Sequence, residues 1–101
     1  MILESTIQAK IIKWLKSDGY FVTKLMGTST NGIPDVLAIK DGRTIFIEVK
    51  RPGREAEPLQ KYRMNELINK GVSAIVAHSV EDVIISIKNN QLNLKQINHD
   101  A

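Results

Sequence analysis

The sequence predicts an α/β fold, a single small domain in which helices flank a central mixed β-sheet. Segments with apolar residues at helical spacing alternate with short apolar segments that are typical of strands. In addition, the hairpin predicted over residues 34–51 is largely apolar on both faces, so both faces need a covering layer. A chain of 101 residues can bury one hydrophobic core but not two, so we expect one domain over residues 1–101.

The composition excludes several classes of protein. Hydrophobic residues make up 43% of the chain and charged residues 25%, which is ordinary for a globular domain, and no apolar run is long enough to cross a membrane. Cysteine is absent, which excludes disulfides and thiolate metal sites. Since the N-terminus shows no signal-peptide pattern, we expect a cytoplasmic location. The net charge of +3 permits a polyanionic partner without requiring one.

Residues 4–16 are predicted to form an amphipathic helix that ends at Asp18-Gly19. Its apolar side carries four residues at helical spacing: Ile7, Ile11, Trp14 and Leu15. Glu4 extends this side if the helix begins early enough, and it could then reach a site in the sheet. Two alternatives stay open, because a helix dipole favours an acid at this end and because Ser5 and Gln8 could form a capping box that leaves Glu4 outside the helix.

Residues 20–26 alternate loosely between apolar and polar and are predicted to form a strand. The following segment, residues 27–33, is rich in glycine, serine, threonine and asparagine and is therefore a loop. It is either a solvated connection or a segment that contacts a substrate backbone. Pro34 then suits the first position of the next strand, where a missing N–H does no harm.

The Asp41-Gly42 pair lies between two apolar runs, residues 36–39 and 45–49. Such a pair is a strong signal for a β-hairpin, because a type I′ turn requires positive φ at both central residues. If these two residues form the turn, Lys40 pairs with Arg43, and the register of the whole hairpin follows from that pair.

This register places two carboxylates and an ammonium group on one face of the sheet. Counting outward from the turn brings Asp35 opposite Glu48, and Lys50 shares their face because side chains alternate along a strand. Directly opposed like charges destabilise a sheet by up to ~1 kcal/mol. A divalent cation between the carboxylates would offset this cost, and a salt bridge to Lys50 is the alternative.

A basic turn at residues 51–54 follows, and it either is solvated or faces phosphate. Residues 57–70 are predicted to form a second helix, with Pro58 in its first turn and Gly71 as its stop. Gln60 shares a side of this helix with three apolar residues, Met64, Leu67 and Ile68, so we expect it to face inward. There it could donate to a phosphate or a water, or hydrogen-bond to neighbouring backbone.

The C-terminal part begins with a short predicted strand over residues 73–77. Ser79-x-x-Asp82 then indicates the N-cap of a third helix, which we expect Asn89-Asn90 to end. The remainder should form a short strand at most, and about residues 93–101 a flexible tail. His78 and His99 are isolated in the sequence and are poor candidates for ligands or bases.

The order of elements, with Pro34-Asp35 followed by Glu48-Val49-Lys50, resembles that of the PD-(D/E)XK nuclease superfamily. The finer pattern is similar to its VRR-NUC branch, the virus-type replication–repair nuclease domain. The features in common are the G-x-P before the aspartate, the basic glycine-containing turn, an early helix glutamine at Gln60 and an acid in the N-terminal helix at Glu4. The resemblance covers nearly the whole chain, and the combination is much more specific than PD…ExK alone.

The resemblance implies a restriction-endonuclease-like core in the order αβββαβα and metal-dependent hydrolysis of phosphodiester bonds in DNA. The expected cofactor is Mg²⁺, with Mn²⁺ able to substitute. Small stand-alone members of this branch are similar to Holliday-junction resolvases and act as homodimers, so we expect a homodimer that resolves four-way junctions. The alternatives are cleavage of flaps or other branched DNA, a sequence-tolerant nuclease, and a non-catalytic DNA-binding module of the same fold.

The resemblance also assigns roles to residues of this chain. Asp35, Glu48 and the Val49 backbone carbonyl are the expected metal ligands, and Glu4 would act through water or on a second ion. Lys50 would orient the attacking water or stabilise charge on the phosphate, and Gln60 would hold a phosphate oxygen or the nucleophile. Contacts to flanking DNA phosphates are expected from four basic residues: Arg51, Arg54, Lys61 and Arg63.

Overall fold

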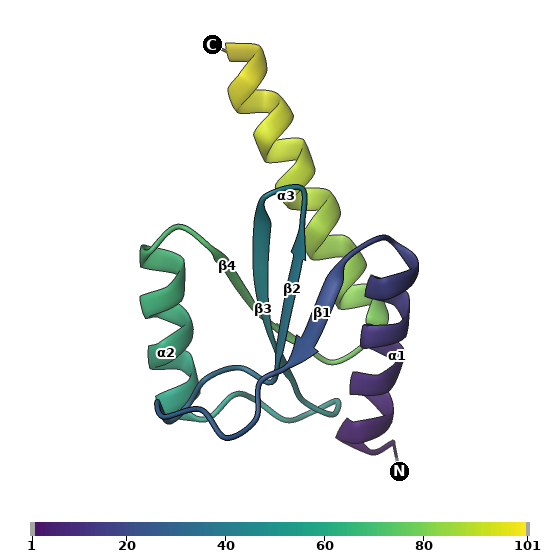
Figure 1. Ribbon diagram of the computed structural model, residues 1–101, viewed down its shortest axis with the longest axis vertical. Helices are drawn as coiled ribbons and strands as arrows, with labels where there is room; N and C mark the ends of the chain where they lie inside the picture. Colours follow the sequence, from purple (N-terminus) through teal and green to yellow (C-terminus); the bar gives the residue numbers. More distant parts are fainter. Residues whose placement is uncertain (1, 101) are drawn as a thin grey trace.

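The computed structural model describes residues 2–100, with side chains for residues 2–90 and the backbone alone for residues 91–100. A four-stranded sheet in the order β1-β2-β3-β4 lies at the centre, with α1 and α3 on one face and α2 on the other (Figure 1). Along the chain the elements are α1 (Glu4–Ser17), β1 (Phe21–Lys24), β2 (Val36–Lys40), β3 (Arg43–Val49), α2 (Pro58–Asn69), β4 (Ser73–Ala77) and α3 (Val80–Asp100). The predicted α/β class, with a mixed sheet between helices, is confirmed.

The β2–β3 hairpin has the predicted register. Lys40 pairs with Arg43, and the antiparallel ladder continues to the pair of Val36 and Ile47. The turn residues Asp41 and Gly42 have φ values of 51° and 76°, the positive values that a type I′ turn requires. Strand β4 pairs with β3 in parallel, which makes the sheet mixed and places the C-terminal ends of β3 and β4 at the same edge.

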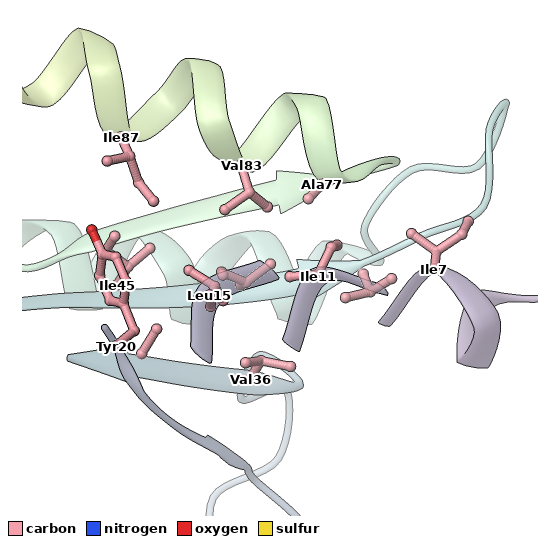
Figure 2. Packing of buried hydrophobic residues seen from close by; sticks show 12 residues of the cluster. Ile7, Ile11, Leu15, Tyr20, Val36, Ile45, Ala77, Val83 and Ile87 are labelled. Carbon is pink, nitrogen blue, oxygen red and sulfur yellow. The ribbon is translucent and has the colours of Figure 1, made fainter. Parts of the chain in front are cut away.

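The main core lies between the sheet and the helix pair α1 and α3. Ile7, Ile11 and Leu15 of α1 are buried there, and α3 contributes Val83 and Ile87 from the other side of the same layer (Figure 2). The hairpin supplies the side chains that point toward these helices: Val36, Ala38, Ile45, Ile47 and Val49. These five alternate with the set that carries Asp35, Glu48 and Lys50, so the charged residues lie on the opposite face, toward α2.

Helix α2 covers this second face and begins and ends as predicted, with Pro58 as its first residue and a stop at Gly71, whose N–H donates to the Ile68 carbonyl. Its inward side was predicted only in part. Met64 is buried, but Ile68 is 48% exposed, so the expectation that it faces inward was wrong. Of the apolar residues expected on the inward side, Met64 alone is fully buried.

Helix α1 begins at Glu4, with Leu3 as its N-cap. The alternative in which Ser5 caps the helix and leaves Glu4 outside is therefore excluded, and Glu4 occupies the first helical position. Strand β1 is shorter than the predicted segment 20–26, since it spans Phe21–Lys24 while Tyr20 places a buried side chain in the core.

Helix α3 begins as predicted, because the Ser79 hydroxyl accepts a hydrogen bond of 3.2 Å from the Asp82 amide. It does not end at Asn89-Asn90 but continues to Asp100, so the predicted stop and the predicted short strand after it were wrong. Asparagine costs a helix only a few tenths of a kcal/mol more than average residues, and neither glycine nor proline follows. A flexible tail over residues 93–101 stays a prediction, and Ala101 lies outside the described residues. Within the described part of the chain, no helix is long and apolar enough to cross a membrane.

Candidate active site

Two carboxylates meet on the face of the sheet that α2 covers, where β2 begins and β3 ends. Asp35 directly precedes β2, and its Oδ2 accepts a hydrogen bond of 2.9 Å from the Val49 amide at the end of β3. Since Val36 pairs with Ile47, the next step outward brings Asp35 beside Glu48, as the predicted register requires. The two acids come from neighbouring strands, so the hairpin itself fixes their separation.

Glu48 is buried in an environment that satisfies only half of its carboxylate. The residue is 2% exposed, and its Oε2 lies 3.2 Å from the Gln60 amide nitrogen and 3.7 Å from the Lys50 ammonium. Its Oε1 is buried and has no hydrogen-bond partner within the described residues. A buried polar atom without a partner costs about 1–3 kcal/mol, more when it is charged, so this oxygen marks a position where a proton, a water or a cation belongs.

Burial is the main reason that the pKa of Glu48 rises to about 8. The negative charge and the closeness of the Asp35 carboxyl raise the pKa further, Lys50 opposes the shift, and the charge of Glu4 adds a smaller increase. Two carboxylates this close do not both ionise at neutral pH unless a cation joins them. In the metal-free protein the pair therefore retains a proton at pH 7.

Gln60 reaches Glu48 because the start of α2 fixes its amide group. The Gln60 side-chain oxygen accepts a hydrogen bond of 2.8 Å from the Glu57 amide, one half of a capping box at the helix start. With the oxygen engaged, the amide nitrogen points to Glu48. Sequence reasoning missed Glu57, although the E-x-x-Q spacing ahead of an apolar helix, with proline in between, was a usable signal.

Glu4 lies at the edge of this site. Its side chain is exposed, and its Oε1 is 3.5 Å from the Arg51 amide, which is the long limit of a hydrogen bond. Its charge also contributes to the raised pKa of Glu48. The N-terminus of α1 therefore converges with the C-terminal end of β3 and the N-terminal end of α2. The structure brings together all five residues predicted to be catalytic: Glu4, Asp35, Glu48, Lys50 and Gln60. Their catalytic roles stay predictions.

The basic turn after β3 is a tight hydrogen-bonded turn. The Arg54 amide donates to the Arg51 carbonyl at 3.1 Å, and Gly53 has a φ of 86°. A type II turn requires positive φ at its third position, which glycine supplies, and proline is common at its second, so the sequence R-P-G-R specifies this geometry directly. Arg54 is exposed.

The other two basic residues predicted to contact DNA have partners within the protein. Lys61 forms an exposed ion pair with Glu55 at 3.3 Å. Arg63 donates to the Asn31 carbonyl at 2.8 Å and to Glu66 at 2.7 Å, so it holds the loop of residues 27–33 against α2. Contact of either residue with DNA stays a prediction.

Gly32 is the residue that lets this loop approach α2. A Cβ at Gly32 would lie 2.8 Å from the Leu59 Cγ and 3.0 Å from the Leu59 carbonyl oxygen, and the φ of 85° also disfavours any other residue. The loop leads through the buried Pro34 to Asp35. The glycine of the G-x-P-D motif thus lets the loop pack closely against α2, and this packing positions Asp35 at the start of β2.

His78, which is isolated in the sequence, has a distant partner in the fold. Its Nε2 lies 2.8 Å from the carbonyl oxygen of Arg54, although the two residues are 24 positions apart. The cap sequence Ser79-x-x-Asp82 gave an indirect signal, because it fixes the backbone next to this histidine.

The donor set fits a hard divalent cation that takes part of its coordination from solvent or substrate. Among the described residues, no group of three acids or histidines stands close enough to hold a metal ion alone. Mg²⁺ is usually bound by one or two carboxylates together with waters and substrate oxygens, so the pair of Asp35 and Glu48 suits it. The unpartnered Glu48 Oε1 is the free ligand atom that such an ion requires.

Comparison with known proteins identifies the family. The family model of the VRR-NUC domain matches residues 1–81. A curated relative, "Putative nuclease p44" of Acyrthosiphon pisum secondary endosymbiont phage 1, is 29% identical over 80 residues, which cover 78% of this chain and 86% of the relative. A solved VRR_NUC domain structure has a TM-score of 0.75 at 25% identity, covering 84% of this chain and 94% of that one. A second, a VRR_NUC domain protein, has a TM-score of 0.72 at 24% identity and covers 88% of both chains. The chain belongs to the VRR-NUC domain family.

Proposed function

We propose that this protein is a Mg²⁺-dependent endonuclease that hydrolyses phosphodiester bonds in DNA and resolves four-way junctions as a homodimer. One observation carries the proposal: two neighbouring carboxylates, the buried Glu48 with an unpartnered oxygen and the half-buried Asp35, lie beside an ammonium group. Family membership and the name of the phage relative support nuclease activity. With DNA as substrate, the protein would act in the cytoplasm, as its sequence led us to expect.

Asp35 and Glu48 would hold the ion, which Mn²⁺ could replace. The Val49 N–H points toward Asp35, and in an extended strand the carbonyl of the same residue points to the same side, so this carbonyl is the proposed third protein ligand. Glu4, at the edge of the site, would act through water or on a second ion. Bound Mg²⁺ lowers the pKa of a water and acts as a Lewis acid on the phosphate.

Lys50 would stabilise the charge that develops on the phosphate. Its ammonium lies on the same side of the sheet as the acids, 3.7 Å from Glu48, and only 13% of its side chain is exposed. An ammonium shielded from water acts more strongly on a nearby phosphate oxygen than a solvated one. Gln60 would contribute by holding Glu48, and its amide nitrogen could also contact the scissile phosphate.

The homodimer is proposed because it suits the proposed junction substrate. Two symmetric cuts across a junction need two active sites, and each chain carries one. Arg51, Arg54, Lys61 and Arg63 would contact flanking phosphates, which supply affinity without sequence preference. Binding should therefore weaken steeply with added salt.

The test compares linear duplex, flap and four-way-junction DNA, each incubated with the protein and Mg²⁺ or Mn²⁺. We expect symmetric cuts in the junction by the wild type, and no cuts by Asp35→Asn or Glu48→Gln, which should still bind DNA. Light scattering should give the mass of a dimer. Preference for flaps would replace the substrate assignment, and DNA binding without any cleavage would favour a non-catalytic module.

A further inference from the structure

His78 connects the segment after β4 to the basic turn after β3. Because β3 and β4 are parallel, both connections leave the sheet at the same edge (Figure 1). The His78 side chain crosses between them, and its Nε2 lies 2.8 Å from the Arg54 carbonyl oxygen. A carbonyl oxygen can only accept, so the imidazole donates this hydrogen bond.

The orientation of His78 is itself fixed by the cap of α3. Its backbone amide donates to the Asp82 Oδ2 at 2.8 Å, and its Nδ1 lies 3.5 Å from the same carboxylate oxygen. The Asp82 amide is bound in turn by the Ser79 hydroxyl. The Asp82 carboxylate thus faces Nδ1 of the ring, and Nε2 is directed at the basic turn of residues 51–54.

With this contact, both backbone polar groups of Arg54 are held. Its N–H closes the type II turn on Arg51, and its carbonyl is bound by His78. Its side chain, by contrast, is exposed and has no hydrogen-bond or ion-pair partner among residues 2–90. A fixed backbone that presents a free guanidinium loses little conformational entropy when the guanidinium binds an anion.

We infer that His78 is a positioning residue that fixes the basic turn and so presents Arg54 to a DNA phosphate beside the active site. The inference rests on the proposed function for its DNA phosphate, whereas the fixed turn stands on the contacts alone. Neither ring nitrogen faces the acid pair, so His78 acts through Arg54 and not on the reacting atoms.

The first test measures the order of the turn without DNA. Trypsin cleaves after Arg54 but not after Arg51, because proline follows, and the cut gives fragments 1–54 and 55–101 that mass spectrometry identifies. We expect His78→Phe, which fills the space without a donor, to be cut at this bond about tenfold faster than the wild type. His78→Gln keeps a donor of similar reach and should remain close to the wild-type rate. Equal cleavage of the wild type and His78→Phe would overturn the inference.

The second test measures affinity for a four-way junction and for duplex DNA by fluorescence anisotropy in EDTA. His78→Phe should bind about three- to tenfold more weakly, and His78→Gln within about twofold of the wild type. His78→Gln serves as the matched control, because it removes the imidazole and keeps a donor. If His78→Phe fails to fold, His78→Asn replaces it, because its shorter amide cannot reach the Arg54 carbonyl.

The two tests separate the inference from the proposed function. Equal loss of affinity in His78→Phe and His78→Gln, or no loss in either, would overturn the role in DNA binding. If the wild type itself binds no DNA, the proposed function fails and the contact of Arg54 with phosphate falls with it. The trypsin result would then decide alone whether His78 fixes the turn.

Discussion

The raised pKa of Glu48 predicts an unusual dependence of stability on pH in the metal-free protein. In the folded state this carboxyl titrates at about 8, and in the unfolded chain at its ordinary value near 4.5. Between these values the folded protein keeps a proton that the unfolded chain releases, so the free energy of unfolding falls as pH rises. The stability that comes from this retained proton is fully present below pH 4.5 and is lost by the time the pH passes 8.

The size of the effect has a ceiling set by these two values. Each pH unit in the window can remove up to about 1.4 kcal/mol from the free energy of unfolding, so the whole window corresponds to at most about 5 kcal/mol. Small domains have total stabilities of about 5–15 kcal/mol, so even a part of this loss is measurable. Glu48→Gln keeps the shape of the residue and cannot ionise. We therefore expect the variant to match the wild type at pH 5 and to be more stable at pH 8.

The assay is urea unfolding in EDTA at several pH values between 5 and 8, followed by the fluorescence of Trp14, the single tryptophan. Other titrating groups, including both histidines, cancel in the difference between variant and wild type. Glu81→Gln is the matched control, because Glu81 is exposed and should leave the pH profile unchanged. If the stability of the wild type and that of Glu48→Gln change in parallel with pH, whether both rise or both fall, the reasoning is refuted.

Three further predictions follow from the same contacts. Gly32→Ala should lower the free energy of unfolding by about 2–4 kcal/mol, because the new Cβ is strained and overlaps with Leu59. The control Gly27→Ala, with positive φ but nothing within 4 Å, should lower it by only about 1–2 kcal/mol. Urea unfolding measures both, and equal losses would contradict the packing role. Lys50→Gln should reduce single-turnover cleavage by about 10²–10³ while Mn²⁺ still binds, and cleavage within a few-fold of the wild type would exclude charge stabilisation by this residue. Gln60→Met should reduce cleavage about tenfold or more by releasing Glu48, which an unchanged rate would disprove.

The site was predictable from sequence where local geometry alone determines it. Asp41-Gly42 specifies its turn through φ values that few other residues accept, and the turn fixes the register that brings Asp35 to Glu48. In the same way, the Pro52-Gly53 pair specifies the type II turn. In each case a few neighbouring residues limit the backbone to one conformation, so no knowledge of the tertiary structure was needed.

Features that depend on distant segments could not be predicted. His78 seemed isolated because its partner is 24 positions away and is a backbone carbonyl, which no residue pattern reveals. The spacing of Ile68 placed it inward, but whether a helix position is buried depends on which distant segments pack against that side of the helix. Likewise, the unpartnered Glu48 Oε1 is a property of the assembled site, since several elements close around it.

The central claim, that the acid pair holds a divalent cation, is tested most directly by titrating Mn²⁺ and Mg²⁺ into the protein in a calorimeter. The wild type should bind at least one ion per chain and release protons on binding at pH 7, because the ion displaces the proton that the pair retains. Asp35→Asn should bind none above background. Equal binding by the wild type and Asp35→Asn, or no binding by the wild type even with junction DNA present, would contradict the account.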